Sequence, residues 1–223
     1  MGTMMQLSTA DGATISAYRA EPAQASRGGL IVVQEIFGVN SHIRSVCDGY
    51  AADGYTAIAP ALFDRYEKNV DLGYAPADID AGRALKARAS TDAALLDVEA
   101  ARDALARDGR KIGIVGYCWG GFIAWMAAAR VDGLACAITY YGGGMTDDLG
   151  ARRRCPVLAH FGERDKVIPM SGVEKLRSAF PEVQVFTYAA DHGFNCDQRG
   201  SYDAPSAKLA RERTLSFLRE NVG

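Results

Sequence analysis

Short, uninterrupted runs of apolar and often β-branched residues recur along the chain. A run of this kind, without polar alternation, is typical of a strand that is buried on both faces of a parallel sheet. Turn residues such as Gly54 and Pro60 bound the runs and keep them at strand length. We expect buried strands over residues 29–34, 55–59, 111–116, 134–140, 156–161 and 183–188.

Between these runs, apolar residues recur at every third or fourth position, which predicts amphipathic helices. Asn40 or Ser41 is placed to cap a helix that stops at Gly54, and Thr91 is placed to cap a longer helix over residues 91–109. Residues 61–90 are the least regular segment, where we expect a long loop with a helix near 79–88. Further helices are expected over residues 119–130, 172–179 and 205–220.

The N-terminal segment carries a different pattern. Residues 3–20 alternate around Asp11-Gly12, a dipeptide that is favoured in β-hairpin turns. The rest of the chain alternates strand and helix, which implies right-handed crossovers and parallel strands, with the hairpin antiparallel at one edge. We therefore predict an α/β fold in one domain over residues 1–223, with a mostly parallel, twisted sheet of about seven to eight strands and helices on both faces.

Composition and charge exclude several classes of protein. Apolar residues make up 48% and charged residues 23% of the 223 residues, which is typical of folded globular chains and not of disordered ones. Lys and Arg number 25 against 27 for Asp and Glu, so we expect no nucleic-acid partner. No apolar run approaches the roughly 18 residues of a membrane span, and the N-terminus lacks a signal-peptide pattern. We expect a cytoplasmic protein without a membrane partner; its oligomeric state leaves no signal in the sequence.

The five cysteines lie at positions 47, 118, 136, 155 and 196. They are odd in number, widely spaced and without a Cys-x-x-Cys pair, which is not the pattern of a disulfide framework. The three histidines show no metal-ligand spacing. We therefore expect no metal and no cofactor, and we expect most of the thiols to behave as small buried apolar groups.

One cysteine stands in a special context. Gly-Tyr-Cys-Trp-Gly-Gly at residues 116–121 joins a predicted strand to a predicted helix and matches the G-x-nucleophile-x-G elbow of α/β-hydrolases, with Cys118 in place of the usual serine. The elbow needs these glycines because side chains there would collide in the strained turn. A helix N-terminus also favours a thiolate. A structural cysteine beside a tight turn is the alternative, and the setting favours a nucleophile.

A thiol nucleophile needs a base, and the chain offers three histidines. His42 begins a predicted helix and is expected to be solvated or to cap that helix, whereas His160 is expected to pack within its strand. His192 follows the strand that ends at Tyr188, at the carboxyl edge of the sheet, where the reactive groups of such folds gather. His192 is therefore the predicted base.

The residue that orients this base should lie between nucleophile and histidine in chain order. Asp165 does so, directly after the predicted strand over residues 156–161. Glu163 and Asp191 are rivals, although Asp191 is poorly placed because it adjoins His192 in sequence. A turn or helix cap is the structural alternative for Asp165.

The oxyanion that forms on attack needs two backbone N–H donors. The elbow offers the amide of Trp119, and the loop after the first buried strand, Glu35-Ile36-Phe37-Gly38, offers the amide of Ile36. Glu35 then lies at the carboxyl edge within reach of Cys118, where a carboxylate without a task would be costly.

Together, Gln-Glu-Ile-Phe-Gly-Val-Asn at 34–40, the elbow, Asp165 and His192-Gly193-Phe194 resemble the dienelactone hydrolase (carboxymethylenebutenolidase) family over essentially the whole chain. The resemblance implies an α/β-hydrolase fold with Cys118 as nucleophile, His192 as base and Asp165 as the orienting acid. It also implies that Glu35 keeps the resting thiol neutral and takes its proton when substrate binds. Tyr140 matches a position that lines the family's pocket.

One position departs from the family pattern. Well-known members carry an arginine four residues after the catalytic histidine, which clamps the substrate carboxylate, and this chain has Cys196 there. A second clamp arginine belongs to the irregular segment, where Arg83 is the match. Arg83 and Arg199 are both candidates to bind an anionic substrate group, because bidentate Arg–carboxylate recognition supplies position as well as energy.

The leading prediction is therefore a metal-free hydrolase that cleaves a small-molecule ester or lactone through a Cys-His-Asp triad and a thioester acyl-enzyme. One alternative is a non-catalytic α/β-hydrolase scaffold that binds a small ligand, since a fold does not fix a function. Another is a redox-responsive thiol protein in which Cys118 oxidises, with Cys196 as its possible partner.

Overall fold

The computed structural model describes residues 1–106 and 109–223. Within these residues eight strands form one sheet in the order β1-β2-β4-β3-β5-β6-β7-β8. β1 pairs antiparallel with β2 and β2 antiparallel with β4, whereas all later neighbours pair in parallel, which confirms the predicted fold class. The strands are β1 (Thr3–Ser8), β2 (Thr14–Ala20), β3 (Gly29–Val33), β4 (Thr56–Pro60), β5 (Ile112–Tyr117), β6 (Cys136–Tyr140), β7 (Val157–Gly162) and β8 (Gln184–Tyr188).

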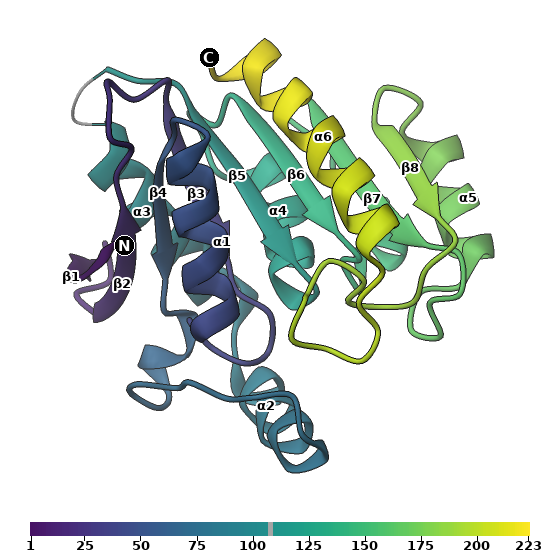
Figure 1. Cartoon of the computed structure of the whole chain (residues 1–223), viewed down its shortest axis with the longest axis horizontal. Helices are drawn as coiled ribbons and strands as arrows, with labels where there is room; N and C mark the ends of the chain where they lie inside the picture. The colour runs from purple at the N-terminus through teal and green to yellow at the C-terminus, as the bar shows by residue number, and fades with distance from the viewer. Residues whose placement is uncertain (107–108) are drawn as a thin grey trace.

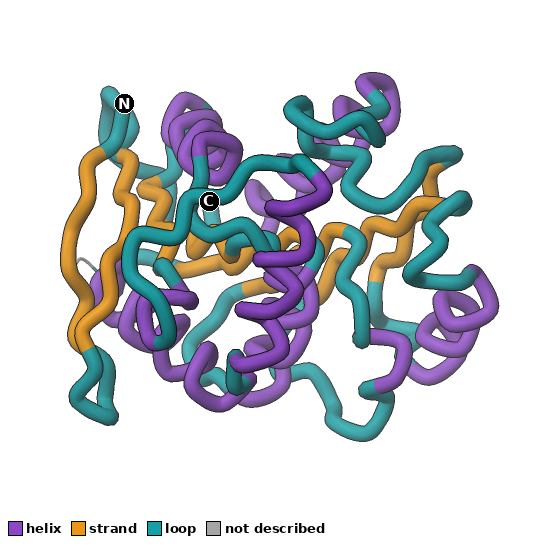
Figure 2. Tube along the Cα trace, turned by 90° about the horizontal axis from the view of Figure 1, so that it is seen from below, coloured by secondary structure: helices purple, strands orange, loops and turns teal. Residues whose placement is uncertain are grey.

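Helices cover both faces of the sheet. In Figure 1, α1 and α6 lie on the face toward the viewer and α3 and α4 lie behind the strands, and Figure 2 shows helices on both sides of the band of strands. The helices are α1 (Ser41–Ala52), α2 (Pro76–Arg88), α3 (Thr91–Ala106), α4 (Trp119–Arg130), α5 (Met170–Ala179) and α6 (Ala204–Asn221), with short 3₁₀ turns η1 (Leu62–Arg65) and η2 (Met145–Asp147).

The burial pattern explains the run of apolar residues in each central strand. Every residue of β3, β4, β5, β6 and β7 is buried, because helices cover both faces of these strands. The edge strand β1 has a single buried residue, Leu7. The apolar core thus lies along the middle of the sheet and holds its strands in fixed register.

Several element boundaries differ from the predictions. Helix α2 starts at Pro76, three residues before the expected start, because proline is well tolerated at the first helical position and the Asp78 carboxylate accepts from the amide of Ala75. Ser90, not Thr91, caps α3: its hydroxyl accepts from the amide of Ala93 at 3.4 Å. The predicted end of that helix falls on residues 107–108, which lie outside the described residues.

The carboxyl ends of the parallel strands meet at one edge of the sheet, the lower edge in Figure 1. Helix α2 and the segment that leads into α6 lie at this edge. The turn between β5 and α4 and the loops after β3, β7 and β8 therefore converge there, as expected for an α/β sheet. Among the described residues, no helix combines the length and the apolar character that crossing a membrane requires.

Candidate active site

Cys118 occupies a strained turn between β5 and α4. Its backbone has φ 55° and ψ −118°, in a region that non-glycine residues rarely adopt. A Cβ on Gly116 would lie 1.8 Å from the carbonyl oxygen of Gly120, and one on Gly120 would lie 2.4 Å from that of Gln34. The amide of Cys118 donates to Tyr140 at 3.0 Å. The missing side chains let the turn pack against the ends of β3 and β6, which fixes the direction of the thiol.

The structure brings Cys118, His192 and Asp165 together. His192 Nε2 lies 3.2 Å from Cys118 Sγ, and His192 Nδ1 lies 2.7 Å from Asp165 Oδ2. The Asp165 side chain is fully buried, and that of His192 is 16% exposed. A carboxylate beside Nδ1 keeps the proton on that nitrogen and directs Nε2 at the thiol. The arrangement is that of a nucleophile, a base and the group that orients the base.

The loop after β7 holds Asp165 in place. Asp165 Oδ1 accepts from the backbone amides of Val167 at 2.7 Å and Ile168 at 3.1 Å, which leaves Oδ2 for the histidine. Burial lowers the pKa of His192, but its hydrogen bonds to Asp165 and Cys118 outweigh burial and raise that pKa to about 10. An imidazole with this pKa is protonated at neutral pH, and its positive charge lies against the Cys118 sulfur.

The two amides expected to receive an oxyanion come from different segments of the chain. The Trp119 amide begins α4, and the Ile36 amide lies in the loop after β3. Within the described part of the chain, neither amide donates a backbone hydrogen bond. Helix α2 supports the Ile36 loop closely, because a Cβ on Gly82 would lie 2.4 Å from the Ile36 carbonyl oxygen. Both N–H groups are therefore available to a ligand.

Glu35 is buried next to this site but is hydrogen bonded to other groups than the thiol. Its Oε1 accepts from Arg199 Nη1 at 3.0 Å, and its Oε2 accepts from the Tyr74 hydroxyl at 3.3 Å. Burial and the Glu35 charge raise the pKa of Tyr74, so this hydroxyl stays protonated and donates. The resemblance implies a resting thiol held by Glu35. In this structure, instead, the thiol of Cys118 lies against His192.

Tyr140 is placed differently from the expectation that it lines the pocket. It is buried at the end of β6, and its hydroxyl lies 2.8 Å from that of Thr214 on α6. The next residue, Tyr141, has its ring centroid 5.1 Å from that of His192, and its buried hydroxyl has no hydrogen-bond partner among the described residues. Successive residues at a strand end point in opposite directions, so the Tyr-Tyr pair already contained this ambiguity.

Two further residues need correction. Arg83, the expected clamp, has a side chain that is 71% exposed and lies 3.7 Å from Asp80 on the surface of α2. His42, expected to be solvated or capping, is 3% exposed, because Asn40 caps α1 and the ring turns inward. Arg199, whose side chain is 18% exposed, is the arginine that reaches Glu35. His160 packs in β7 as expected.

Cys196 lies close to two other side chains that can bind a metal, Glu35 and His42. All five cysteines are free, and Cys196 is fully buried. Ligand atoms of Glu35, His42 and Cys196 lie within 4.8 Å of one another. These residues are far apart in sequence, so ligand spacing along the chain could not reveal them.

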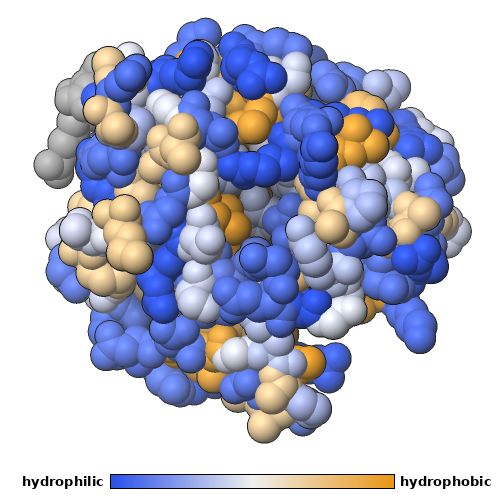
Figure 3. Space-filling model, in the orientation of Figure 1, coloured by the Kyte–Doolittle hydropathy of each residue, from blue (hydrophilic) through white to orange (hydrophobic). Residues whose placement is uncertain are grey.

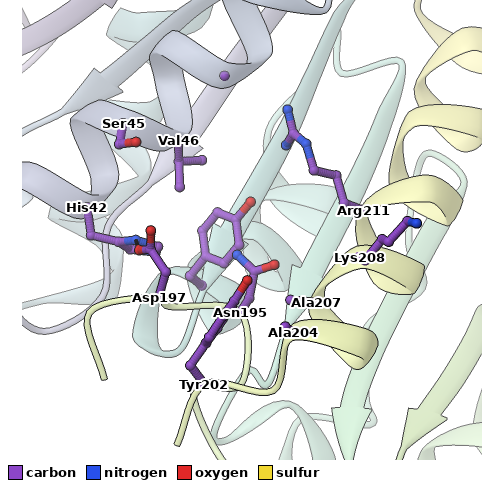
Figure 4. A pocket seen from close by; sticks show the side chains of 12 residues that line it. His42, Ser45, Val46, Asn195, Asp197, Tyr202, Ala204, Ala207, Lys208 and Arg211 are labelled. Carbon is purple, nitrogen blue, oxygen red and sulfur yellow. Dashed lines mark hydrogen bonds and ion pairs between the residues drawn. The ribbon is translucent and has the colours of Figure 1, made fainter. Parts of the chain in front are cut away.

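A cavity of about 430 Å³ lies between α1 and α6. Figure 3 shows a mainly hydrophilic face that is hollowed between these helices. In Figure 4, His42 and Asp197 meet on one side of the cavity, and Lys208 and Arg211 from α6 lie on the other. The ring nitrogen His42 Nδ1 lies 3.3 Å from Asp197 Oδ1. His42 therefore connects the cavity wall with the neighbourhood of Glu35 and Cys196.

The sequence matches a known protein family over nearly its whole length. The family model described as "Dienelactone hydrolase family" matches residues 15–222. A protein of Synechocystis sp. named "Putative carboxymethylenebutenolidase" is 38% identical over 228 residues, which cover 93% of this chain and 92% of that protein. A protein of the same name from Escherichia coli (strain K12) is 34% identical over 233 residues, which cover 95% of this chain and 84% of that protein.

Solved structures agree with the sequence comparisons. A crystal structure described as "Putative Dienelactone Hydrolase" from Klebsiella pneumoniae has a TM-score of 0.85 at 32% identity, with 97% of this chain and 98% of that chain covered. A dienelactone hydrolase-like promiscuous phosphotriesterase from metagenomic libraries shares the fold, with a TM-score of 0.79 at 22% identity over 100% of this chain and 99% of that chain. A family match that spans nearly the whole chain, together with relatives above 30% identity, shows that this chain belongs to the dienelactone hydrolase family.

Proposed function

We propose that this protein hydrolyses a carboxylic ester or lactone through a thioester on Cys118, with His192 as the base and Asp165 as the acid that orients it. As a member of its family the chain is an ester or lactone hydrolase. The proposal adds the residues and the covalent intermediate. The observation that carries it is the continuous contact from Cys118 Sγ to His192 Nε2 at 3.2 Å and from His192 Nδ1 to Asp165 Oδ2 at 2.7 Å.

The proposed reaction begins with a thiolate that His192 stabilises as an imidazolium. The Cys118 sulfur attacks the carbonyl carbon, and the carbonyl electrons move onto an oxygen that accepts hydrogen bonds from the amides of Ile36 and Trp119. The intermediate collapses, the bond to the leaving alkoxide breaks, and His192 donates its Nε2 proton to that oxygen. The products of this half-reaction are a free alcohol, or the opened ring of a lactone, and a thioester.

The second half-reaction uses the same groups in reverse. His192, now neutral, takes a proton from water as the water oxygen attacks the thioester carbon. The tetrahedral intermediate uses the same two amides, and its collapse breaks the C–S bond, which releases a carboxylic acid. The buried Asp165 carboxylate keeps Nδ1 protonated and the ring in position throughout, and two backbone amides hold that carboxylate.

The charge arrangement points to a substrate that carries a carboxylate of its own. Arg199 is a mostly buried cation whose partner at 3.0 Å is Glu35. A substrate carboxylate that bound Arg199 would compete with Glu35 for this cation. The Tyr141 hydroxyl is buried and has no partner within residues 1–106 and 109–223, so it can donate to the same ligand. Arg199 thus takes the anion-binding role that Cys196 cannot have.

A panel of lactones and aryl esters, each with and without a carboxylate, tests this proposal. We expect turnover to be fastest for the acidic members, and we expect mass spectrometry of a quenched reaction to find the acyl group on Cys118. Arg199→Ala should remove the preference for acidic substrates and retain slow hydrolysis of the neutral ones. If no member of the panel acylates Cys118, the scaffold and redox-thiol alternatives are favoured instead.

A further inference from the structure

Three buried side chains from distant parts of the chain meet beside the catalytic residues. A carboxylate oxygen of Glu35, a ring nitrogen of His42 and the sulfur of Cys196 all lie within 4.8 Å of one another. Their residues are 1%, 3% and 0% exposed, so the group is enclosed by the protein. An oxygen, a nitrogen and a sulfur ligand together form the mixed set that zinc accepts at sites with three protein ligands.

His42 adds an independent observation. Its Nε2 is buried and has no hydrogen-bond partner in the described part of the chain, while its Nδ1 lies 3.3 Å from Asp197 Oδ1. A buried ring nitrogen without a partner is costly, because it has lost its hydrogen bonds to water. Histidines that bind metals characteristically donate their second N–H to a carboxylate, which fixes the tautomer and leaves the other nitrogen as the ligand. Figure 4 shows His42 and Asp197 pointing toward one another at the cavity.

We propose that Glu35, His42 and Cys196 bind Zn²⁺ or a similarly thiophilic divalent cation, and that the bound ion inhibits the hydrolase. Glu35 supplies one carboxylate oxygen, His42 supplies Nε2, and Cys196 supplies its sulfur. The fourth position takes water. Hard cations such as Mg²⁺ do not favour a sulfur ligand, so the site discriminates against them.

The binding step balances without an oxidant or reductant. Cys196 gives up its S–H proton to solvent as the metal–sulfur bond forms, and Glu35 and neutral His42 bind through existing lone pairs. In a tetrahedral zinc site the ligand atoms lie about 3.5 Å apart. Side-chain rotations that move the three ligand atoms by roughly 1 Å would bring them to this spacing. Arg199 keeps its hydrogen bond to the Glu35 oxygen that does not bind the ion. Its positive charge opposes the ion, which sets the site to bind weakly and reversibly.

Inhibition follows from the position of Glu35, and this part rests on the proposed function. An ion on Glu35 fixes this carboxylate in its hydrogen bond with Arg199, so a substrate carboxylate cannot take its place. It also places positive charge beside Arg199 and changes the electrostatic field at the Cys118 sulfur. Metal binding itself is independent of the catalytic mechanism, so binding and inhibition can be tested separately.

Binding is tested on Cys118→Ala protein, because the catalytic Cys118–His192 pair could itself hold a soft metal. We expect this variant to bind one Co²⁺ with a thiolate-to-cobalt charge-transfer band in the near ultraviolet, and Zn²⁺ to displace it. Adding Cys196→Ser should abolish the band. Adding Asp197→Asn, which removes only the carboxylate behind His42, should weaken binding about tenfold. Adding Cys155→Ser is the matched control and should change nothing.

Two results would overturn the assignment. One is a Cys118→Ala protein that gives no charge-transfer band with Co²⁺ in large excess. The other is a band that persists when Cys196→Ser is added, which would place the ion on a different thiol. His42→Gln provides a second variant if the serine substitution impairs folding, and it should weaken Co²⁺ binding at least tenfold.

The inhibitory effect is tested on protein with an intact Cys118. Zn²⁺ should slow ester hydrolysis by the unmodified protein, and excess chelator should restore it. Cys196→Ser should keep its turnover in the absence of metal and resist the same Zn²⁺ concentration. If that variant is inhibited as strongly as the unmodified protein, the ion acts on Cys118 and the inhibitory role is refuted, whatever the binding experiment shows.

Discussion

Arg199 Nη1 lies 3.0 Å from Glu35 Oε1, and the two residues are 164 positions apart in the chain. The pair joins the loop after β3 to the segment that leads into α6. Arg199 also lies over the rings of Phe37 and Tyr74, at 5.7 and 5.8 Å from their centroids, so its guanidinium is held by aromatic faces as well as by charge. It follows His192, the proposed base, by seven positions, and Cys196 stands four positions after that histidine.

Glu35→Gln should change alkylation of Cys118 and hydrolysis in opposite directions. Removal of this carboxylate deletes a negative charge near Cys118 and leaves Arg199 without its anionic partner, so the surroundings favour the thiolate more strongly. Alkylation by iodoacetamide at neutral pH should become faster. Hydrolysis should become at least about tenfold slower, because Arg199, the proposed ligand of the substrate carboxylate, loses the partner that positions it.

The matched control is Glu163→Gln, another acid after a strand end, whose carboxylate accepts from Thr187 and not from Arg199. It should leave both rates unchanged. Alkylation that is unchanged or slower in the Glu35 variant would remove Glu35 from the mechanism.

Two substitutions of Cys118 separate the backbone strain at this residue from its proposed role in hydrolysis. Both Cys118→Ala and Cys118→Gly should lose hydrolysis by several orders of magnitude, because the nucleophile is gone. Glycine adopts the backbone angles of this residue without strain, so Cys118→Gly should unfold with a free energy about 1 kcal/mol higher than Cys118→Ala. Urea titration of the two variants measures the difference; equal stability would show that the elbow is not strained.

Cys118→Ser is expected to be a poor enzyme as well. A hydroxyl is a much weaker acid than a thiol, and the His192 imidazolium in this site stabilises a thiolate and does not act as a neutral base toward the hydroxyl. Turnover comparable to that of the cysteine enzyme would contradict the ion-pair description. Both kcat and the acylation burst should be measured, since a slow second step would hide a competent first one.

Asp165→Asn tests the orienting acid with little change in shape. The asparagine oxygen can still accept from the amides of Val167 and Ile168, so the loop should keep its conformation. Its NH₂ group would then face His192 Nδ1 and favour the wrong tautomer. We expect kcat to fall by a factor on the order of 10³ or more, with little change in melting temperature. A loss below tenfold would point to Glu163 or Asp191 as the true partner.

The burial of His160 should make the free energy of unfolding depend on pH, independently of catalysis. Burial, together with the Arg213 charge, lowers the pKa of His160 to about 3. The unfolded histidine takes up a proton below about 6.5, so between these values the unfolded state binds more protons and stability falls as pH falls. The slope should be about 1.4 kcal/mol per pH unit. His160→Gln should be less stable at pH 7.5 but should lack this component of the slope between pH 6.5 and 5.

Treatment with a strong chelator provides a simple check on the chemistry. The proposed steps route every proton and every charge through side chains and backbone amides. Turnover of the purified protein should therefore be undiminished after dialysis against the chelator. A loss of activity that returned on addition of a metal would show that an ion takes part in hydrolysis itself.

Much of the fold could be predicted because its signals are local. A run such as Leu30 to Val33 is buried on both faces, and apolar runs of this kind mark the central strands whatever lies elsewhere in the chain. The elbow is equally local, since its glycines and its nucleophile are fixed by clashes within a few residues and with the adjoining strand ends. The positions of strand ends also singled out His192 and Asp165, and the structure places His192 against Cys118 and Asp165 against His192.

The side-chain partners could not be predicted in the same way. The His42 ring turns inward because Asn40 caps the helix. Nothing near His42 in the sequence predicts that Asp197 and Cys196 are its neighbours in the fold. Tyr140 and Tyr141 are adjacent, and only the three-dimensional course of the chain after β6 decides which one faces His192. The partner of Glu35 likewise depends on how the segment before α6 returns to the sheet.

The glycines of the elbow have a practical consequence for engineering. The space that a Cβ on Gly116, Gly120 or Gly121 would occupy already contains backbone atoms, at 1.8, 2.4 and 2.8 Å. A mutagenesis library that varies these positions would consist mostly of misfolded proteins. Substitutions that change the substrate range should instead be made at Tyr141 and Arg199, whose side chains can change without moving the turn. New activities can be selected there while the Cys118 thiol keeps its position and direction.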